Sequence, residues 1–189
     1  MKGSAIPLNL PNAITIGRIF LVPLLVVVLL TKFEGHLILG VRKEFVGAAI
    51  FGLASLTDWL DGYLARRRQQ VTTLGQFMDP LADKLLITAA LVSLVQMDLA
   101  QSWMVVVILG REIYVTVLRS LAQSRGIPIP ASPLGKFKMV SQVIAILLLI
   151  LSDHVAEFAL LGKIALWVAM ITAVVSAFDY YRRFSNVIA

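Results

Sequence analysis

Six long apolar stretches constrain this chain more than any other feature of its sequence. They cover roughly residues 14–33, 44–65, 79–97, 101–121, 137–153 and 158–181. Each is close to the roughly 20 residues that a helix needs to cross a bilayer. Apolar residues make up 59% of the chain and charged residues 15%, against about 45–50% and about 25% in soluble domains. We therefore predict an all-α polytopic membrane protein with six transmembrane helices, forming a single domain over residues 1–189.

The charge and the N-terminal segment refine this prediction. A net charge of +6 in so apolar a chain favours anionic headgroups or phosphorylated substrates over nucleic acid as partners. The chain has no cysteine, which excludes disulfides and thiolate metal sites. The segment IPLNLPNAITIGR predicts a short interfacial segment before the first helix, with Asn12 or Thr15 as its cap. Arg18 either extends to the headgroups or contributes to a substrate site.

Six helices place both termini on the same side of a bilayer. That side carries eleven basic residues, Lys2, Arg18, Arg66, Arg67, Arg68, Arg119, Arg125, Lys136, Lys138, Arg182 and Arg183. The opposite side carries four, Lys32, Arg42, Lys43 and Lys163. Because basic residues accumulate on the cytoplasmic side, we expect both termini and the loop between the second and third helices to face the cytoplasm.

Four aspartates lie at the facing ends of the second and third apolar stretches: Asp58, Asp61, Asp79 and Asp83. The first two are three positions apart and the last two are four apart, so on helices each pair occupies one face, one turn apart. The polar connecting segment RRRQQVTTLGQFM allows the two helices to run antiparallel. The spacing therefore predicts that four carboxylates converge in one pocket.

Such a carboxylate cluster requires a counter-charge. Ionised groups within a helix bundle are costly, and they are functional by default. Ligands that offer only oxygen favour Mg2+ or Mn2+, and nearby histidine or cysteine that would indicate zinc is absent from the motif. Four carboxylates can hold two such ions, an arrangement suited to displacement at phosphorus.

The residues between the two pairs agree with this chemistry. Gly62 and Gly75 remove side chains where a phosphate or ribose would approach the backbone. Arg66 offers a planar set of donors for a phosphate. Pro80 suits the first turn of the following helix, where no amide donor is needed.

Taken together, these residues resemble the signature of the CDP-alcohol phosphotransferases. The matching positions, in which every spacer agrees, are Asp58, Asp61, Gly62, Ala65, Arg66, Gly75, Asp79 and Asp83. The segments NLPNAITIGRIFLVP, TDWLDGYLARR, FMDPLADKLL, GREIYVTVLRS and GKFKMVSQ are also similar to the bacterial branch that uses sn-glycerol 3-phosphate as acceptor. The longer resemblance covers most of the chain.

The resemblance implies a six-helix enzyme of the bacterial inner membrane, commonly a homodimer, with its active site at the cytoplasmic face. The implied reaction transfers the phosphatidyl group of CDP-diacylglycerol to sn-glycerol 3-phosphate and releases CMP by metal-assisted in-line attack. It implies metal-site roles for all four aspartates, and for Asp83 also the role of general base. Thr57 and Asn12 are weaker candidates for nucleotide contacts, beside Gly62, Arg66 and Gly75.

The acceptor carries a phosphate, so a second cationic site is expected. The candidates lie near the cytoplasmic ends of the fourth and fifth helices: Arg111, Arg119, Lys136 and Lys138. Arg111 and Arg119 are eight positions apart, close to one helix face. Arg111 would bind an anion or pair with Glu112 or an aspartate, whereas Arg119 and Lys138 would bind the acceptor or only anchor to headgroups.

Two alternatives remain open from the residues alone. Within the enzyme class, the acceptor could be inositol phosphate, another alcohol or a second phospholipid such as phosphatidylglycerol. From a different class, the protein could be a divalent-cation transporter, because intramembrane carboxylates also mark ion pathways. The acidic groups collect near one interface, and transport does not explain the Gly-Ala-Arg insert, so the sequence favours the enzyme.

Overall fold

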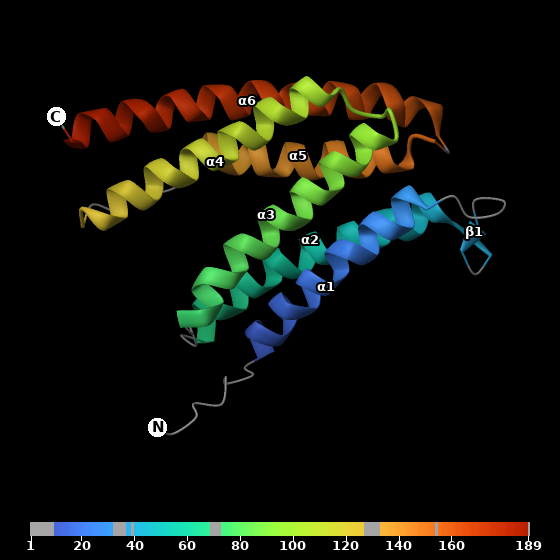
Figure 1. The fold of residues 1–189 in the computed structure, drawn as a ribbon, viewed down its shortest axis with the longest axis horizontal. Helices are drawn as coiled ribbons and strands as arrows, with labels where there is room; N and C mark the ends of the chain where they lie inside the picture. Colours follow the sequence, from blue (N-terminus) through green and yellow to red (C-terminus); the bar gives the residue numbers. More distant parts are fainter. Residues whose placement is uncertain are drawn as a thin grey trace. The chain divides into compact units, whose positions relative to one another are not determined.

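The computed structural model describes residues 10–31, 37–38, 40–68, 73–126, 133–153 and 155–188. At residues 10–13, 58–68, 73–77, 79, 156 and 186–188 it describes only the backbone. The elements along the described chain are α1 (Leu10–Leu30), β1 (Leu37–Ile38), β2 (Val41–Arg42), α2 (Lys43–Arg68), α3 (Thr73–Gln96), α4 (Ser102–Ser124), α5 (Pro133–Leu151) and α6 (Ala156–Ile188) (Figure 1). The chain divides into two compact units, Met1–Ala90 and Leu91–Ala189. The division falls within α3, and the prediction of a single domain stays a prediction.

All six predicted apolar stretches are helical, which confirms the helical fold class. Among the described residues, the one addition is the short β1–β2 hairpin. Each helix extends beyond its apolar stretch at one end or at both, because hydropathy marks the apolar part of a helix and not its end. The predicted connecting segment RRRQQVTTLGQFM was too long, because only residues 69–72 lie between α2 and α3.

Two local predictions at helix starts were also wrong. Helix α1 begins at Leu10, so neither Asn12 nor Thr15 is its N-cap. Helix α3 begins at Thr73, and Pro80 lies in its interior. A proline there removes one backbone hydrogen bond and crowds the preceding turn, so the polar residues before Pro80 continue the helix despite that cost.

Two described helices are long and apolar enough to cross a membrane, Pro133–Leu151 and Glu157–Ser185. A third apolar segment, Ile14–Leu30, is shorter. Helices α2, α3 and α4 contain the aspartates and arginines of the predicted site, which lowers their hydropathy. Many large apolar side chains are nevertheless exposed along the helices, among them Phe20, Leu53, Leu85, Val106, Ile113, Leu160, Ile171 and Phe178. Helices with apolar residues on both their buried and exposed faces are typical of a membrane protein.

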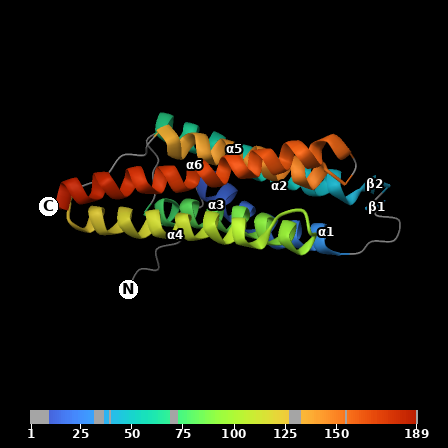
Figure 2. The ribbon, with the colours of Figure 1, turned by 90° about the horizontal axis from the view of Figure 1, so that it is seen from above.

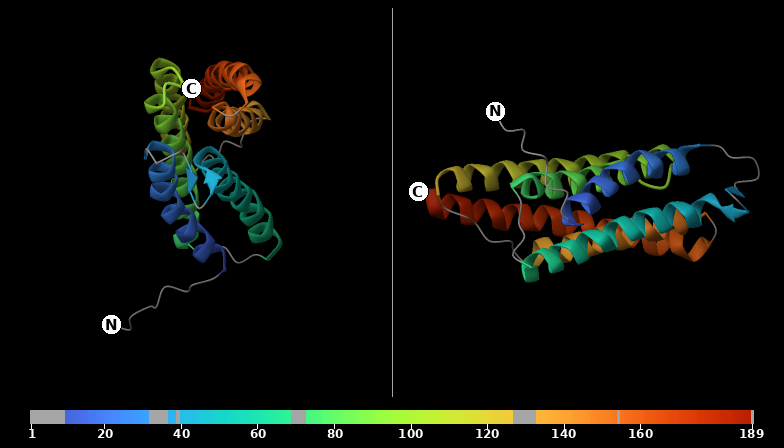
Figure 3. Two further views of the ribbon diagram at one scale, coloured as in Figure 1. Left: turned by 90° about the vertical axis from the view of Figure 1, so that its right-hand side faces the viewer. Right: turned by 90° about the horizontal axis from the view of Figure 1, so that it is seen from below.

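In the first unit, α1 packs against α2 (Figure 3). Leu25 and Leu29 of α1 and Phe51 and Ala54 of α2 are fully buried or nearly so. These positions recur at helical spacing, so one face of each helix is buried while the other stays exposed. Arg18 is also buried on α1, which contradicts the reading that it extends to the headgroups.

The connection from α1 to α2 is held by a hairpin and a lysine. Strands β1 and β2 pair antiparallel, with Leu37 opposite Arg42, and Gly40 between them has φ of 80°, a conformation that favours glycine. Lys43, the first residue of α2, donates to the carbonyl oxygens of Leu29 at 3.2 Å and Thr31 at 3.4 Å. The last turn of α1 has no basic residue of its own, so Lys43 supplies the positive charge that favours a helix C-terminus.

In the second unit, α6 packs against both α4 and α5, and Figure 2 shows α5 and α6 side by side. Ile108 of α4, Ile146 and Leu149 of α5, and Ala169 and Ala173 of α6 are buried. The small residues on α6 allow its backbone to approach the neighbouring helices closely, which is how helices associate in membranes.

Gly162 marks the closest approach of α5 and α6. A Cβ atom at Gly162 would lie 2.8 Å from Cγ of Leu149 and 3.1 Å from its backbone nitrogen. We expect Gly162→Ala to lower the free energy of unfolding in detergent by about 1–3 kcal/mol, the usual cost of overpacking. The control is Gly110→Ala on α4, where nothing lies within 4 Å and alanine should stabilise the helix by up to about 1 kcal/mol. Equal stability of the two variants would contradict this account of the α5–α6 contact.

Candidate active site

The four predicted aspartates lie on two consecutive helices. Asp58 and Asp61 are within α2, and Asp79 and Asp83 are within α3. The helical backbone at all four positions confirms the premise that each pair lies one turn apart on one face. The side chains of Asp58, Asp61 and Asp79 lie outside the described residues, so their convergence stays a prediction.

The end of α2 and the start of α3 are kept near each other by the short link between them. Only residues 69–72 separate Arg68 from Thr73, so the Cα atoms of these two residues are at most about 19 Å apart. The two helices run in opposite directions from this link (Figures 1 and 3). The local fold therefore supports the hairpin arrangement that the aspartate spacing predicts.

Asp83 and Thr57 are the members of this site whose side chains are described. Asp83 is half-buried on α3, between the buried residues Ala82 and Leu86. Thr57 Oγ1 lies 2.6 Å from the carbonyl oxygen of Leu53 and 2.9 Å from that of Ala54. Because its single hydroxyl proton is directed to its own helix, Thr57 can offer a nucleotide an acceptor but not a donor in this rotamer.

The remaining nucleotide candidates are placed only by their backbone. Gly62 and Arg66 lie on α2, Gly75 lies on α3, and Asn12 lies in the first turns of α1. Their side chains, where they have one, fall outside the described residues.

The donor chemistry of the aspartate helices fits a divalent cation. The four positions present carboxylates in helical pairs, and the neighbouring positions of α2 and α3 offer neither histidine nor cysteine. Hard oxygen donors of this kind suit Mg2+ or Mn2+. Three of the four carboxylate side chains lie outside the described residues.

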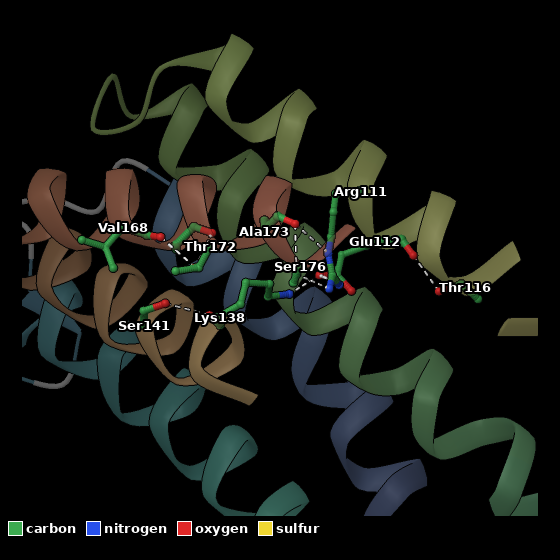
Figure 4. Close-up of polar contacts among 10 residues, drawn as sticks. Arg111, Glu112, Thr116, Lys138, Ser141, Val168, Thr172, Ala173 and Ser176 are labelled. Carbon is green, nitrogen blue, oxygen red and sulfur yellow. Dashed lines mark hydrogen bonds and ion pairs between the residues drawn. The ribbon is translucent and has the colours of Figure 1, made fainter. Parts of the chain in front are cut away.

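Glu112 joins two of the predicted acceptor-site cations. Nζ of Lys138 forms an ion pair with Oε1 of Glu112, and Nη1 of Arg111 lies 3.4 Å from the same oxygen (Figure 4). The side chains of Arg111, Glu112 and Lys138 are 10%, 22% and 7% exposed. Two cations therefore share one anion in a largely buried setting. We call Arg111, Glu112, Lys138 and Ser176 the Glu112 cluster, and it carries a formal charge of one positive unit.

Helix α6 supplies the other partners of Arg111. Its Nη2 donates to Oγ of Ser176 at 2.6 Å, and its Nε donates to the carbonyl oxygen of Ala173 at 3.3 Å (Figure 4). Ser176 is fully buried and donates in turn to the Ala173 carbonyl oxygen at 3.0 Å. Ser176 was not predicted from the sequence, although a lone serine in the apolar run of α6 is a signal that could have identified it.

Arg119 lies on the same side of α4 as Arg111 but has a different partner. Its Nε donates to the hydroxyl oxygen of Tyr180 at 3.3 Å, and its guanidinium carbon lies 5.6 Å from the centre of the Tyr180 ring. Both arginines therefore contact α6, which confirms the shared face predicted from their eight-residue spacing. Tyr180 is buried, and it too was missed.

The two lysines of α5 are in different environments. Lys138 is buried in the Glu112 cluster, while Lys136 is exposed, as expected for residues two apart on a helix. The four predicted cations thus do not form a single cluster. One turn beyond Lys138 lies Gln142, which is 2% exposed, and its Nε2 has no hydrogen-bond partner among the described residues. A buried amide donor without a partner is costly, so it indicates a site for a polar group.

The sequence of this chain matches a known protein family over most of its length. Residues 8–175 match the CDP-alcohol phosphatidyltransferase family. The chain belongs to the CDP-alcohol phosphatidyltransferase family. All four aspartates and the basic residues of α4 and α5 lie within the matched region.

Relatives in this family are similar over nearly their whole length. The CDP-diacylglycerol–glycerol-3-phosphate 3-phosphatidyltransferase of Bacillus subtilis is 45% identical over 184 residues, covering 93% of this chain and 94% of that protein. The protein of the same name from Rickettsia typhi is 36% identical, covering 92% and 96%. A probable phosphatidylglycerophosphate synthase of Mycobacterium tuberculosis is 38% identical, covering 97% and 85%. CDP-alcohol phosphatidyltransferases are enzymes, so the family leaves the cation-transporter alternative without support.

Proposed function

We propose that this chain transfers the phosphatidyl group of CDP-diacylglycerol to sn-glycerol 3-phosphate, which yields phosphatidylglycerophosphate and CMP. The observation that carries the proposal is the 45% identity, over 93% of the chain, to a relative whose name states this reaction. Family membership supports the dependence on CDP-diacylglycerol. The identity of the acceptor, sn-glycerol 3-phosphate, rests on the relatives' names.

The proposed step is a displacement at phosphorus. The C1 hydroxyl oxygen of the acceptor forms a bond to the lipid-bearing phosphorus, and the bond from that phosphorus to the CMP oxygen breaks. Asp83 accepts the hydroxyl proton. Asp83 is half-buried on α3, and as a general base it would have to lie within hydrogen-bond reach of the acceptor hydroxyl. Phosphoryl transfer of this kind needs mainly positioning and charge stabilisation.

Asp58, Asp61, Asp79 and Asp83 would hold Mg2+ or Mn2+, two ions in our proposal. When bound, such ions neutralise the charge of the diphosphate and of the departing CMP. The protein contributes the helical spacing that presents two carboxylates from each of α2 and α3. Gly62, Arg66, Gly75, Thr57 and Asn12 remain our candidates for contacts with the CDP moiety.

Cations on α4 and α5 are proposed to bind the acceptor phosphate. Lys136 and Arg119 are exposed and can reach a soluble anion. Arg111 and Lys138 contribute the net positive charge of the Glu112 cluster, which lowers the energy of a dianionic phosphate nearby. Nε2 of Gln142, which has no hydrogen-bond partner among the described residues, adds a donor on the same buried face of α5 as Lys138.

The finer membrane assignment is also proposed. Two apolar helices and the bacterial relatives support a membrane protein. We propose that all six helices cross the bacterial inner membrane, that both termini and the active site face the cytoplasm, and that the enzyme is a homodimer surrounded by membrane lipids. Cysteine-accessibility labelling at residues before α1 and after α6 tests the orientation, and labelling of both from the periplasmic side would contradict it.

The decisive experiment is an acceptor panel. The purified protein in detergent receives CDP-diacylglycerol with Mg2+, Mn2+ or a chelator, and each of glycerol 3-phosphate, inositol phosphate, serine or phosphatidylglycerol. We expect CMP release only with glycerol 3-phosphate and only when a divalent cation is present. CMP release that is independent of glycerol 3-phosphate would exclude the proposed acceptor, whereas activity in the chelator would exclude the metal requirement.

Removal of the exposed cations tests the acceptor site. We expect Lys136→Ala and Arg119→Ala each to raise the KM for glycerol 3-phosphate about tenfold, the loss of one charge-assisted hydrogen bond, with little change in the KM for CDP-diacylglycerol. The control is Arg125→Ala, which removes an exposed charge at the C-terminus of α4. Equal effects on both substrates would indicate a general structural role instead.

A further inference from the structure

A cavity with both polar and apolar lining residues lies within the second unit, near the turn that joins α3 to α4. Its volume is about 490 Å³, within the range of about 300–1,000 Å³ typical of ligand pockets. Its lining includes Asp98, Trp103, Lys163 and Trp167. None of these residues belongs to the aspartate motif or to the Glu112 cluster, and the proposed reaction does not use them.

The cavity contains one cation and one anion that are both available. Within the part of the chain that the structure describes, neither Lys163 nor Asp98 forms an ion pair. Both side chains are exposed at the cavity. An exposed charge without a partner is ordinary, but two opposite charges that line one cavity without pairing match a ligand that carries both charges.

Asp98 occupies a position where its own helix does not favour it. The amide of Leu99 donates to the carbonyl oxygen of Leu94 at 2.9 Å, and that of Asp98 donates to Val95 at 3.0 Å. This pattern ends α3 with Asp98 in the left-handed conformation, at φ of 60°, where glycine is the usual residue. A carboxylate is also unfavourable at the negative end of a helix dipole. Aspartate tolerates the left-handed conformation better than most residues, but its charge is unfavourable at this end of the helix, and a cationic ligand group would offset that cost.

Two tryptophans complete the lining. The rings of Trp103 and Trp167 meet edge to face, with centroids 5.5 Å apart, and both residues are about half exposed. Nε1 of Trp103 donates to Oε1 of Gln101 at 2.6 Å, which fixes the indole on α4. Aromatic faces attract ammonium groups, and tryptophan is enriched at the level of lipid headgroups.

We infer that this cavity binds the headgroup of a zwitterionic phospholipid, in which Lys163 contacts the phosphodiester and Asp98 and the tryptophans contact the ammonium group. An anionic headgroup fits less well, because it would leave Asp98 beside a negative charge. The inference rests on α5 and α6 lying in a membrane, as their apolar length indicates, and not on the phosphotransfer reaction.

Tryptophan fluorescence tests this site directly. The chain has three tryptophans, so Trp59→Phe leaves only the two that line the cavity. The full-length variant in detergent is titrated with brominated phosphatidylethanolamine or brominated phosphatidylglycerol, which quench nearby indoles. We expect the ethanolamine lipid to quench at about tenfold lower mole fraction, because its ammonium group can form an ion pair with Asp98, whereas the hydroxyl groups of the glycerol headgroup carry no positive charge.

Two conservative variants test the contributions of Asp98 and Lys163 separately. Asp98→Asn keeps a residue that tolerates the left-handed conformation and should make the two lipids quench alike. Lys163→Gln should weaken quenching by both lipids, while Arg125→Gln, which removes an exposed charge at the other end of α4, should change neither. Soluble glycerophosphoethanolamine should displace the ethanolamine lipid only at far higher concentration if the acyl chains contribute. Displacement at equal concentration would assign the site to the free headgroup.

The inference is overturned if both lipids quench equally in the starting protein, if the preference survives Asp98→Asn, or if Lys163→Gln leaves quenching by both lipids unchanged. Any of these results would mean only non-selective contact of the tryptophans with lipid. Because the readout is binding and not CMP release, its failure is distinguishable from a failure of the proposed enzymatic activity.

Discussion

Asp83→Asn should abolish turnover, with a fall in kcat of at least about 100-fold, because removal of a general base usually costs about 10²–10⁴ in rate. Asparagine has nearly the same shape but cannot accept the acceptor's hydroxyl proton. Binding of CDP-diacylglycerol should persist, since three of the four proposed metal-site aspartates remain. Steady-state CMP release measures the first effect, and equilibrium binding of the nucleotide substrate measures the second.

The matched control is Asp153→Asn, which removes an exposed carboxylate in the turn between α5 and α6. It should leave kcat unchanged. Because Asp83 is also a proposed metal ligand, binding of Mn2+ to both variants needs to be measured by spin resonance. Near-normal turnover of Asp83→Asn would rule out the role of base. A loss of activity that excess Mn2+ restores would assign Asp83 to the metal site alone.

Glu112→Ala should have the largest effect on stability. In the folded protein Glu112 is the shared partner of Arg111 and Lys138, whose side chains are 10% and 7% exposed. Its removal leaves two largely buried cations facing each other without a counter-charge. Breaking a buried ion pair costs about 3–5 kcal/mol, and we expect about 3 kcal/mol here because Glu112 is partly exposed. Unfolding in mixed micelles of denaturing and mild detergent measures the change.

Two comparisons make this prediction specific. Glu157→Ala removes an exposed carboxylate from the first turn of α6 and should cost no more than about 1 kcal/mol. Glu112→Ala combined with Lys138→Met removes the Glu112–Lys138 pair as a whole and should recover part of the lost stability, because no buried cation remains on α5 without a counter-charge. Wild-type stability of Glu112→Ala would show that the ion pairs contribute nothing measurable.

The Glu112 cluster also bears on how the acceptor would be recognised. Glu112 holds Arg111 and Lys138 in place but neutralises only one of their two charges. Ser176 and the Ala173 carbonyl then orient the guanidinium of Arg111 from α6. The cations are therefore fixed before an anion arrives, which reduces the entropy lost on binding. Lys136 and Arg119, which are more exposed, are the residues whose loss should change the KM without a large change in stability.

Much of the fold was predictable from the sequence because it depends on local properties. The apolar stretches were long enough to identify all six helices, and the spacing of the aspartates needs only a helical backbone to place each pair on one face. The eight-residue spacing of Arg111 and Arg119 predicted their shared face for the same reason. Where the local signal was weak, prediction failed: residues 73–78 belong to α3 and not to the connecting segment, and Pro80 lies inside the helix.

The sequence by itself determined the helices and the family, and it predicted the chemical type of the site, since these follow from hydropathy, spacing and residue type. Only the tertiary structure decided which charges meet. Glu112 forms ion pairs with Arg111 and Lys138, Tyr180 accepts a hydrogen bond from Arg119, and Lys136 is exposed. The partners Ser176 and Tyr180 lie more than sixty positions from the arginines that they contact, and Asp98 and Lys163 line one cavity from separate elements. The physical reason is that an ion pair or a cavity depends on how helices pack against each other, which no local pattern specifies.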